Sequence, residues 1–179
     1  SCWSMGVNVI PGAPVMMSNI EVNIRSDARL FSSVLENLPL ASGDQLNQQY
    51  YEEIKTNLSS RAVETGFFSA RFERSQLLLD LQANTANASI DFNPGERYRF
   101  GDVRIQPVEE LLDDFIRRFI NFEEEAYYSS AALIGLRNSL NDSQYFSTVT
   151  VTPVLNASQD TTVPITIALE PRPRHVYSV

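Results

Sequence analysis

The feature that most constrains this chain is an internal repeat. Residues 8–15 resemble residues 91–98, because each is a strand-like stretch that leads into a Pro-Gly turn, and residues 168–174 are a looser third copy. Later in each unit, residues 65–72 resemble residues 143–150. Similarity at a nearly constant spacing is typical of a chain built from tandem modules of one kind. The repeat therefore predicts two complete modules rather than one larger domain.

Each unit predicts the same order of elements. Alternating apolar and polar residues over 18–24 and 101–105 indicate half-buried strands. Shorter helices are expected at 28–37 and 110–120, and a longer amphipathic helix follows each of them. The apolar stripes of the longer helices are expected to consist of Leu46, Tyr50, Ile54 and Leu58 in the first unit, and of Leu133, Leu136 and Leu140 in the second.

Each unit then closes with a predicted strand hairpin. The first pairs 69–81 with 88–93 through a turn near Asn84, and the second pairs 147–155 with 163–169 through a turn at 156–160. Asn47 and Ser129 occupy matching positions before the longer helices and are predicted N-caps. Between the longer helix and the aromatic pair, the first unit has about four more residues than the second. Four residues is close to one helical turn, so the apolar stripe stays in phase.

The predicted fold class is α+β, with two tandem β-α-α-β-β modules. Each module is a three-stranded mixed sheet covered on one face by two helices. We expect residues 1–10 to be the last strand of a preceding module, 11–93 and 94–171 to be the two modules, and 172–179 to lead into a following domain.

Composition argues against several classes of function. The net charge of -8 disfavours nucleic-acid binding, which requires a basic face. The single histidine, His175, excludes a multi-histidine metal site or a histidine-based triad, and no cluster of nucleophile and base supports a hydrolase. Cys2 is the only cysteine, so the chain has no internal disulfide. We therefore expect no enzyme activity, no cofactor, no metal and no small-molecule substrate.

Two acidic runs and two aromatic pairs are the remaining candidate sites. The run at 123–125 and the pair Asp113-Asp114 are interpreted as solvated surface, because adjacent carboxylates diverge and a cation site needs converging oxygens. In the pairs at 67–68 and 145–146, at least one ring of each is expected in the core.

Three motifs carry a resemblance to a known family. They are Pro-Gly-Glu-Arg-Tyr-Arg-Phe-Gly at 94–101, Tyr-Phe-Ser at 145–147, and Glu-Pro-Arg-Pro-Arg-His-Val-Tyr-Ser at 170–178. With the element order, they resemble the POTRA (polypeptide-transport-associated) modules of the BamA/TamA outer-membrane assembly superfamily, and TamA-like members in particular. The first unit departs from the pattern, with Val-Met-Met-Ser at 15–18 in place of Tyr-Arg-Phe-Gly.

The resemblance implies a periplasmic, non-catalytic scaffold that helps insert or secrete outer-membrane proteins, including autotransporters. The implied partners are the protein's own C-terminal β-barrel, expected beyond this chain, a TamB-like partner anchored in the inner membrane, and client outer-membrane polypeptides. The alternatives are a BamA-like insertase, a two-partner secretion transporter, or a free-standing periplasmic peptide-binding module. The segment leading to the barrel is expected to comprise Pro171, Arg172, Pro173, Arg174, His175 and Tyr177.

The backbone of an edge strand is the expected binding site for client polypeptides. An open sheet leaves unpaired N–H and C=O groups along its edges, and an extended segment can add there as a further strand. The candidates lie in the first strand of each closing hairpin, although charge at Arg71, Glu73 and Arg74 is able to block the first of them. The candidate residues are Ser69, Ala70, Arg71, Phe72, Glu73, Ser147, Thr148, Val149, Thr150 and Val151.

Overall fold

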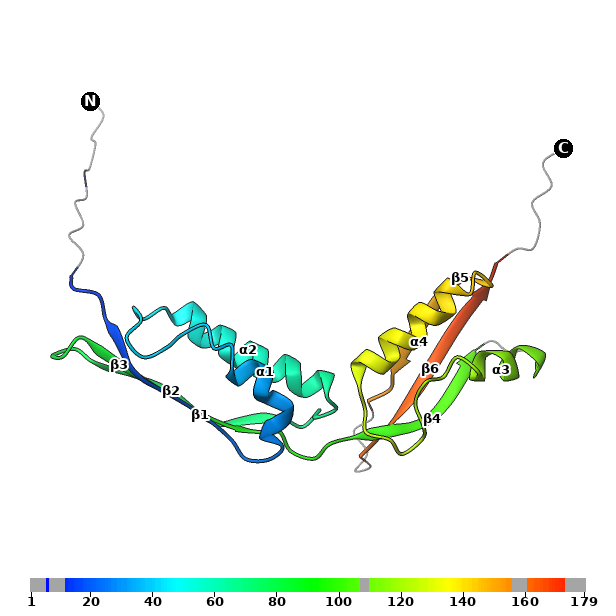
Figure 1. The fold of residues 1–179 in the computed structure, drawn as a ribbon, viewed down its shortest axis with the longest axis horizontal. Helices are drawn as coiled ribbons and strands as arrows, with labels where there is room; N and C mark the ends of the chain where they lie inside the picture. Colours follow the sequence, from blue (N-terminus) through cyan, green and yellow to red (C-terminus); the bar gives the residue numbers. More distant parts are fainter. Residues whose placement is uncertain (1–5, 7–11, 107–109, 156–160, 173–179) are drawn as a thin grey trace.

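The computed structural model describes residues 6, 12–106, 110–155 and 161–172. It forms two modules, one after the other along the chain, and each has its own sheet (Figure 1). The first module contains β1 (Met16–Ile24), the 3-10 helix η1 (Ala28–Phe31), α1 (Ser32–Leu35), α2 (Gln48–Glu64), β2 (Arg71–Asp80) and β3 (Thr85–Asn93). The second contains β4 (Arg99–Gln106), α3 (Glu110–Arg117), α4 (Ser130–Asp142), β5 (Phe146–Pro153) and β6 (Thr162–Pro171).

Both sheets have the same topology. The strand orders are β1-β3-β2 and β4-β6-β5. In each, the first strand runs parallel to the central strand and the hairpin strand runs antiparallel to it. The prediction of two tandem β-α-α-β-β modules with three-stranded mixed sheets is therefore confirmed.

The central strand of each sheet supplies much of the core. One face of β3 buries Ala86, Ala88, Ile90 and Phe92, and the matching face of β6 buries Val163, Ile165, Ile167 and Leu169. The alternate residues are more exposed, because successive side chains of a strand point to opposite faces. Helices cover the apolar face, so each module has its own cluster of buried residues.

Matching hydrogen bonds extend the repeat into the loops. The N–H of Met17 donates to the carbonyl of Asp44 over 2.7 Å, and the N–H of Phe100 donates to Ala126 over 2.9 Å. Met17 and Phe100 are both buried at the same place in their modules. The methionine-rich segment at 15–18 therefore occupies the same structural position as Tyr-Arg-Phe-Gly and makes the matching backbone hydrogen bond, with different side chains.

The helices agree with the repeat in length but differ from the prediction in detail. Helix α2 has 17 residues and α4 has 13, so the longer first unit does add about one turn to the helix. The apolar stripe predicted for α4 is buried. The stripe predicted for α2 is wrong at Tyr50, which is 41% exposed, whereas the next residue, Tyr51, is buried. The short helix expected at 28–37 divides into η1 and α1.

Several predictions fall outside the described residues. They concern the strand expected at 1–10 except for Gly6, the turn at 156–160 and the segment after Arg172, with Pro173, Arg174, His175 and Tyr177. In the described ranges, no helix is long and apolar enough to cross a membrane.

Candidate functional site

The two candidate strands lie at sheet edges. Because β3 and β6 are the central strands, β2 and β5 each pair on one side only within their own sheet. Ser69 and Ala70 precede β2, which begins at Arg71, so they belong to the connection from α2 rather than to the edge itself. Each edge has one register shift near the start of its strand, so the two edges are distinguished by their charge.

The edge of β2 is interrupted at its start. The register shifts between Phe72 and Arg74, which leaves Glu73 as an extra residue. The Glu73 carboxylate forms ion pairs with Arg25 and Arg71 and accepts a 2.8 Å hydrogen bond from the Asn93 side chain. A bulge and a charge cluster are both devices that protect an edge from further pairing. This part of β2 is therefore a poor template.

The edge of β5 carries no charge. All its residues from Phe146 to Pro153 are uncharged, and the register shift comes early, between Phe146 and Thr148. Val149 and Val151 turn half-buried side chains toward the core, while Thr148, Thr150 and Thr152 alternate with them. β-Branched residues in this alternation favour an extended strand.

The hydrogen-bond pattern shows which backbone groups of β5 face outward. The N–H of Val154 donates to the Pro164 carbonyl over 2.8 Å. In an antiparallel pair, hydrogen-bonded residues alternate with residues whose N–H and C=O groups point the other way. With Val151 opposite Ile167 in the register, Val149 and Val151 direct both backbone groups away from β6. Among the described residues, no backbone hydrogen bond reaches β5 from outside its own sheet.

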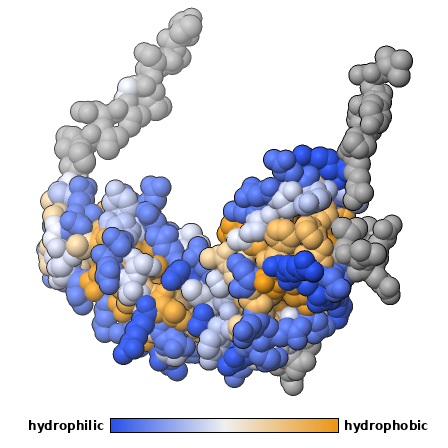
Figure 2. All heavy atoms as spheres, turned by 45° about the vertical axis from the view of Figure 1, so that its right-hand side comes forward, coloured by the Kyte–Doolittle hydropathy of each residue, from blue (hydrophilic) through white to orange (hydrophobic). Residues whose placement is uncertain are grey.

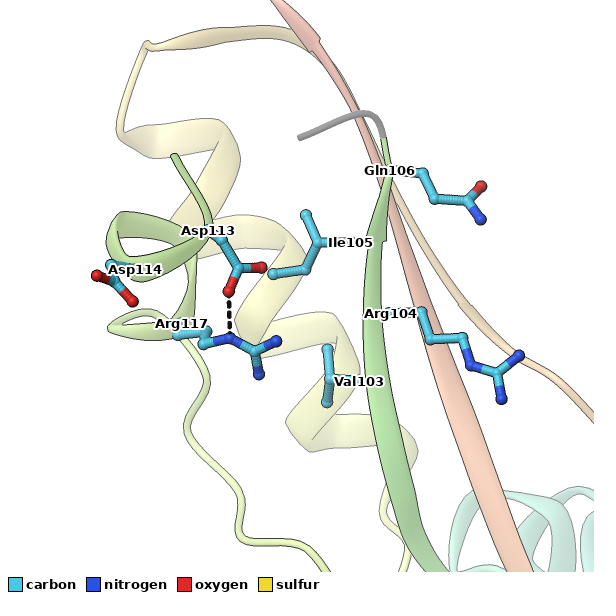
Figure 3. A pocket seen from close by; sticks show the side chains of 7 residues that line it. All are labelled: Val103, Arg104, Ile105, Gln106, Asp113, Asp114 and Arg117. Atoms are coloured by element: carbon cyan, nitrogen blue, oxygen red, sulfur yellow. Dashed lines mark hydrogen bonds and ion pairs between the residues drawn. The ribbon is translucent and has the colours of Figure 1, made fainter. Parts of the chain in front are cut away.

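A groove beside β4 was missed in the sequence. It lies between β4 and α3, has a volume of about 660 Å³, and is lined by residues of both elements. Val103 and Ile105 point into it, whereas Arg104 and Gln106 point away (Figure 3). On the helix side, Asp113 accepts a hydrogen bond from Arg117 Nε, and this bond raises the pKa of Arg117. Strand periodicity predicts which face of β4 is apolar, but not where the helix lies beside it.

The acidic candidates for a cation site either form an ion pair or are exposed to solvent. Asp113 is paired with Arg117, and the three glutamates at 123–125 are exposed, with the N–H of Glu125 donating to the Phe100 carbonyl. Over the ranges that the structure describes, no three His, Cys, Asp or Glu side chains are grouped as metal ligands would be.

The aromatic pairs are oriented differently in the two modules. Phe67 is buried in the first module, while Phe68 packs against the core of the second. In the other pair, Phe146 is buried and Tyr145 is 60% exposed. The prediction that one ring of each pair enters the core is confirmed. At the end of β6, the N–H of Arg172 donates to the Tyr145 carbonyl over 2.9 Å, which ties the start of the predicted barrel lead-in to this module.

Comparison with known protein families decides the nature of the module. The profile of the POTRA family, described as "Surface antigen variable number repeat", matches residues 98–172. Residues 98–172 form a POTRA domain. The first module repeats its topology, so the chain contains two tandem modules of the POTRA fold. The family predicted from the motifs at 94–101, 145–147 and 170–178 is thereby confirmed at the level of POTRA.

Two solved structures of POTRA modules are similar in fold to this chain. BamA from Haemophilus ducreyi lacking POTRA domains 1–3 is 17% identical with a TM-score of 0.63, over 88% of this chain and 29% of that one. POTRA domains 3–5 of Haemophilus influenzae BamA are 16% identical with a TM-score of 0.58, over 88% of this chain and 61% of that one. This chain therefore spans less than two thirds of either protein, and the likeness is one of fold.

Proposed function

We propose that this chain is the periplasmic POTRA region of an outer-membrane β-barrel protein that assembles or translocates other proteins. It acts by contact rather than catalysis. The POTRA domain at 98–172 and the likeness to POTRA modules of BamA support this proposal. We further propose module boundaries at 11–93 and 94–171, with residues 172–179 leading toward the barrel.

The observation that carries the binding role is the β5 edge. Val149 and Val151 present outward N–H and C=O groups on an uncharged strand, and an extended client segment fits there as a fourth strand. Main-chain hydrogen bonds are the same for every sequence, so such a site accepts many clients. The charged bulge at Glu73 makes the β2 edge a weaker site in our proposal.

The finer assignment is to a TamA-like protein that acts on autotransporters with a TamB-like partner. It is supported by the segment 170–178, whose Pro-Arg-Pro-Arg-His run resembles the barrel lead-in of TamA-like proteins. A BamA-like insertase is the alternative that the fold likeness favours. A BamA-like protein carries five such modules, so the module count of the full-length protein distinguishes the two.

The β5 proposal is tested by removing one outward N–H. Val151→Pro deletes the N–H of Val151, which does not pair with β6, and proline is tolerated at edge positions of this kind. The probe is a soluble peptide of alternating valine and threonine flanked by lysines. Wild type is expected to bind it with shifts in the β5 amide signals, measured by NMR titration, and Val151→Pro to lose this binding at least tenfold.

The matched control is Val151→Ala, which trims the same side chain and keeps the N–H. It is expected to bind the probe within about twofold of wild type, because the backbone supplies the contacts. If Val151→Ala and Val151→Pro weaken binding equally, or if the peptide shifts signals away from β5, the edge is not the client site.

A further inference from the structure

The connection between the two modules contains an aromatic residue that leaves its own module. Phe68 follows α2 in the first module, yet its ring packs against the core of the second. The centre of that ring lies 5.3 Å from the Tyr98 ring and 4.9 Å from the Tyr128 ring, both edge to face. This geometry is favourable for aromatic pairs. Phe68 therefore helps to complete a core whose other members come from the next module.

The backbone of the two modules also comes into contact, at Gly66. The Gly66 carbonyl accepts a 2.9 Å hydrogen bond from the N–H of Tyr98, just before β4. Gly66 has φ +92°, and a Cβ at this position would lie 3.0 Å from Cβ of Tyr128. Only glycine allows both this conformation and this approach. The end of α2 is therefore held directly against the start of the second module.

Arg97 crosses the same junction. Its Nε donates to the carbonyl of Thr65 over 2.9 Å, and its guanidinium lies 4.4 Å from the centre of the Tyr127 ring. The same guanidinium is 6.0 Å from the ring of Phe67. A cation over an aromatic face is attractive, most of all where water is partly excluded. Arg97 thus connects the end of α2 in the first module to the loop before α4 in the second.

These contacts matter because the modules touch over only part of their facing sides (Figure 2). Domains joined by a small interface are expected to move relative to one another. We infer that the Phe68 ring, the Gly66 carbonyl and Arg97 instead join the two modules into one rigid body, in which Phe68 is a core residue of the second module. Residues 94–98 then act as a fixed elbow rather than a hinge.

The second module provides an internal comparison. At the equivalent place after α4, Gln144 also has a positive φ, of 62°, and Phe146, the counterpart of Phe68 in the repeat, is buried in the core of its own module. The repeat by itself therefore does not insert an aromatic ring into a neighbour. The Phe68 contact is particular to the junction.

The first test is Phe68→Ala in the whole chain, with Tyr145→Ala as the control. Hydrogen exchange is followed residue by residue. Phe68→Ala is expected to raise exchange in β5 and β6 by about tenfold or more while β2 and β3 change less, because the lost ring belongs to the second core. Tyr145→Ala is expected to have the smaller effect. If β2 and β3 respond most to Phe68→Ala, or if no strand responds, the inference is wrong.

The second test compares Gly66→Ala with Gly43→Ala. Both glycines have φ +92°, but a Cβ at Gly43 meets nothing within 4 Å. Residual dipolar couplings report whether the modules share one orientation. A single alignment tensor is expected for wild type and for Gly43→Ala, and two differing tensors for Gly66→Ala. Two tensors in wild type, or one shared tensor in Gly66→Ala, would overturn the fixed elbow.

Discussion

At the scale of single residues, the two longer helices begin at matching positions with different chemistry. Asn47 accepts a 2.9 Å hydrogen bond from the N–H of Gln49, as an N-cap does. Ser129 occupies the N-cap position of α4, but its side chain makes no such bond. The sequence predicts both positions correctly. The capping bond predicted at both positions is present only at Asn47, because the direction of a serine hydroxyl depends on local packing.

We expect the two caps to differ in energy. Asn47→Ala loses the bond to Gln49 and is expected to lower the free energy of unfolding by about 1 kcal/mol. Ser129→Ala is expected to change it by about 0.5 kcal/mol or less, because no capping bond is lost. Urea unfolding of each variant measures the difference. Equal losses would contradict the assignment of Asn47 as the stronger cap.

The error at Tyr50 has a geometric cause at the same scale. A strict spacing of four residues advances by more than one turn of 3.6 residues, so it drifts around the helix. Tyr51 lies three residues before Ile54 and returns to the buried face, while Tyr50 drifts off it. The sequence shows that an apolar stripe exists. To identify its residues, steps of three and four residues have to be alternated along the helix.

At the scale of elements, the hairpin strands were correctly expected at the edges. A hairpin pairs β2 with β3 and β5 with β6, and the remaining strand of each sheet then lies on the far side of the central strand. The sequence shows only part of the difference between the β2 edge and the β5 edge. Charge at Arg71 and Glu73 is readable from the sequence, but the bulge that gathers it is set by the register of pairing. The groove beside β4 depends on where α3 packs, which no local pattern determines.

Helix α4 offers a test of its predicted faces. Leu136 is fully buried and Ile134 is 50% exposed on the same helix. Leu136→Ala is expected to lower the free energy of unfolding by about 2–5 kcal/mol, because it leaves a cavity in the second core. Ile134→Ala is expected to cost less than about 1 kcal/mol. Thermal unfolding of both variants measures this, and a larger loss for Ile134→Ala would mean that the helix is rotated.

At the scale of the whole molecule, the sequence predicts two modules but not how they are joined. At least one ring of the pair at 67–68 is predicted to enter the core, and Phe67 satisfies that prediction within its own module. Nothing in a local pattern tells which core a second ring will enter. The helix end at Gly66 and the start of β4 have to be close in space before Phe68 can reach Tyr98 and Tyr128.

The hydrogen bond across the junction gives a direct measure of this coupling. The N–H of Tyr98 donates to Gly66 of the first module, and the N–H of Phe100 donates to Ala126 of the second, each over 2.9 Å. If the junction stays closed for as long as the second module is folded, we expect the two amides to exchange with solvent at similarly slow rates. Amide exchange by NMR compares them in one sample. Fast exchange at Tyr98 beside slow exchange at Phe100 would reveal separate opening at the junction.

The β5 edge that is open to pairing is short, and its length limits how long a client segment stays bound. The register shift at Ser147 limits the regular ladder at one end, and Pro153, which has no N–H, limits it at the other. Only Val149 and Val151 then offer both a donor and an acceptor. A segment held by so few bonds leaves quickly. In the proposed function, such brief residence suits a client polypeptide that binds β5 transiently before it moves to its final place.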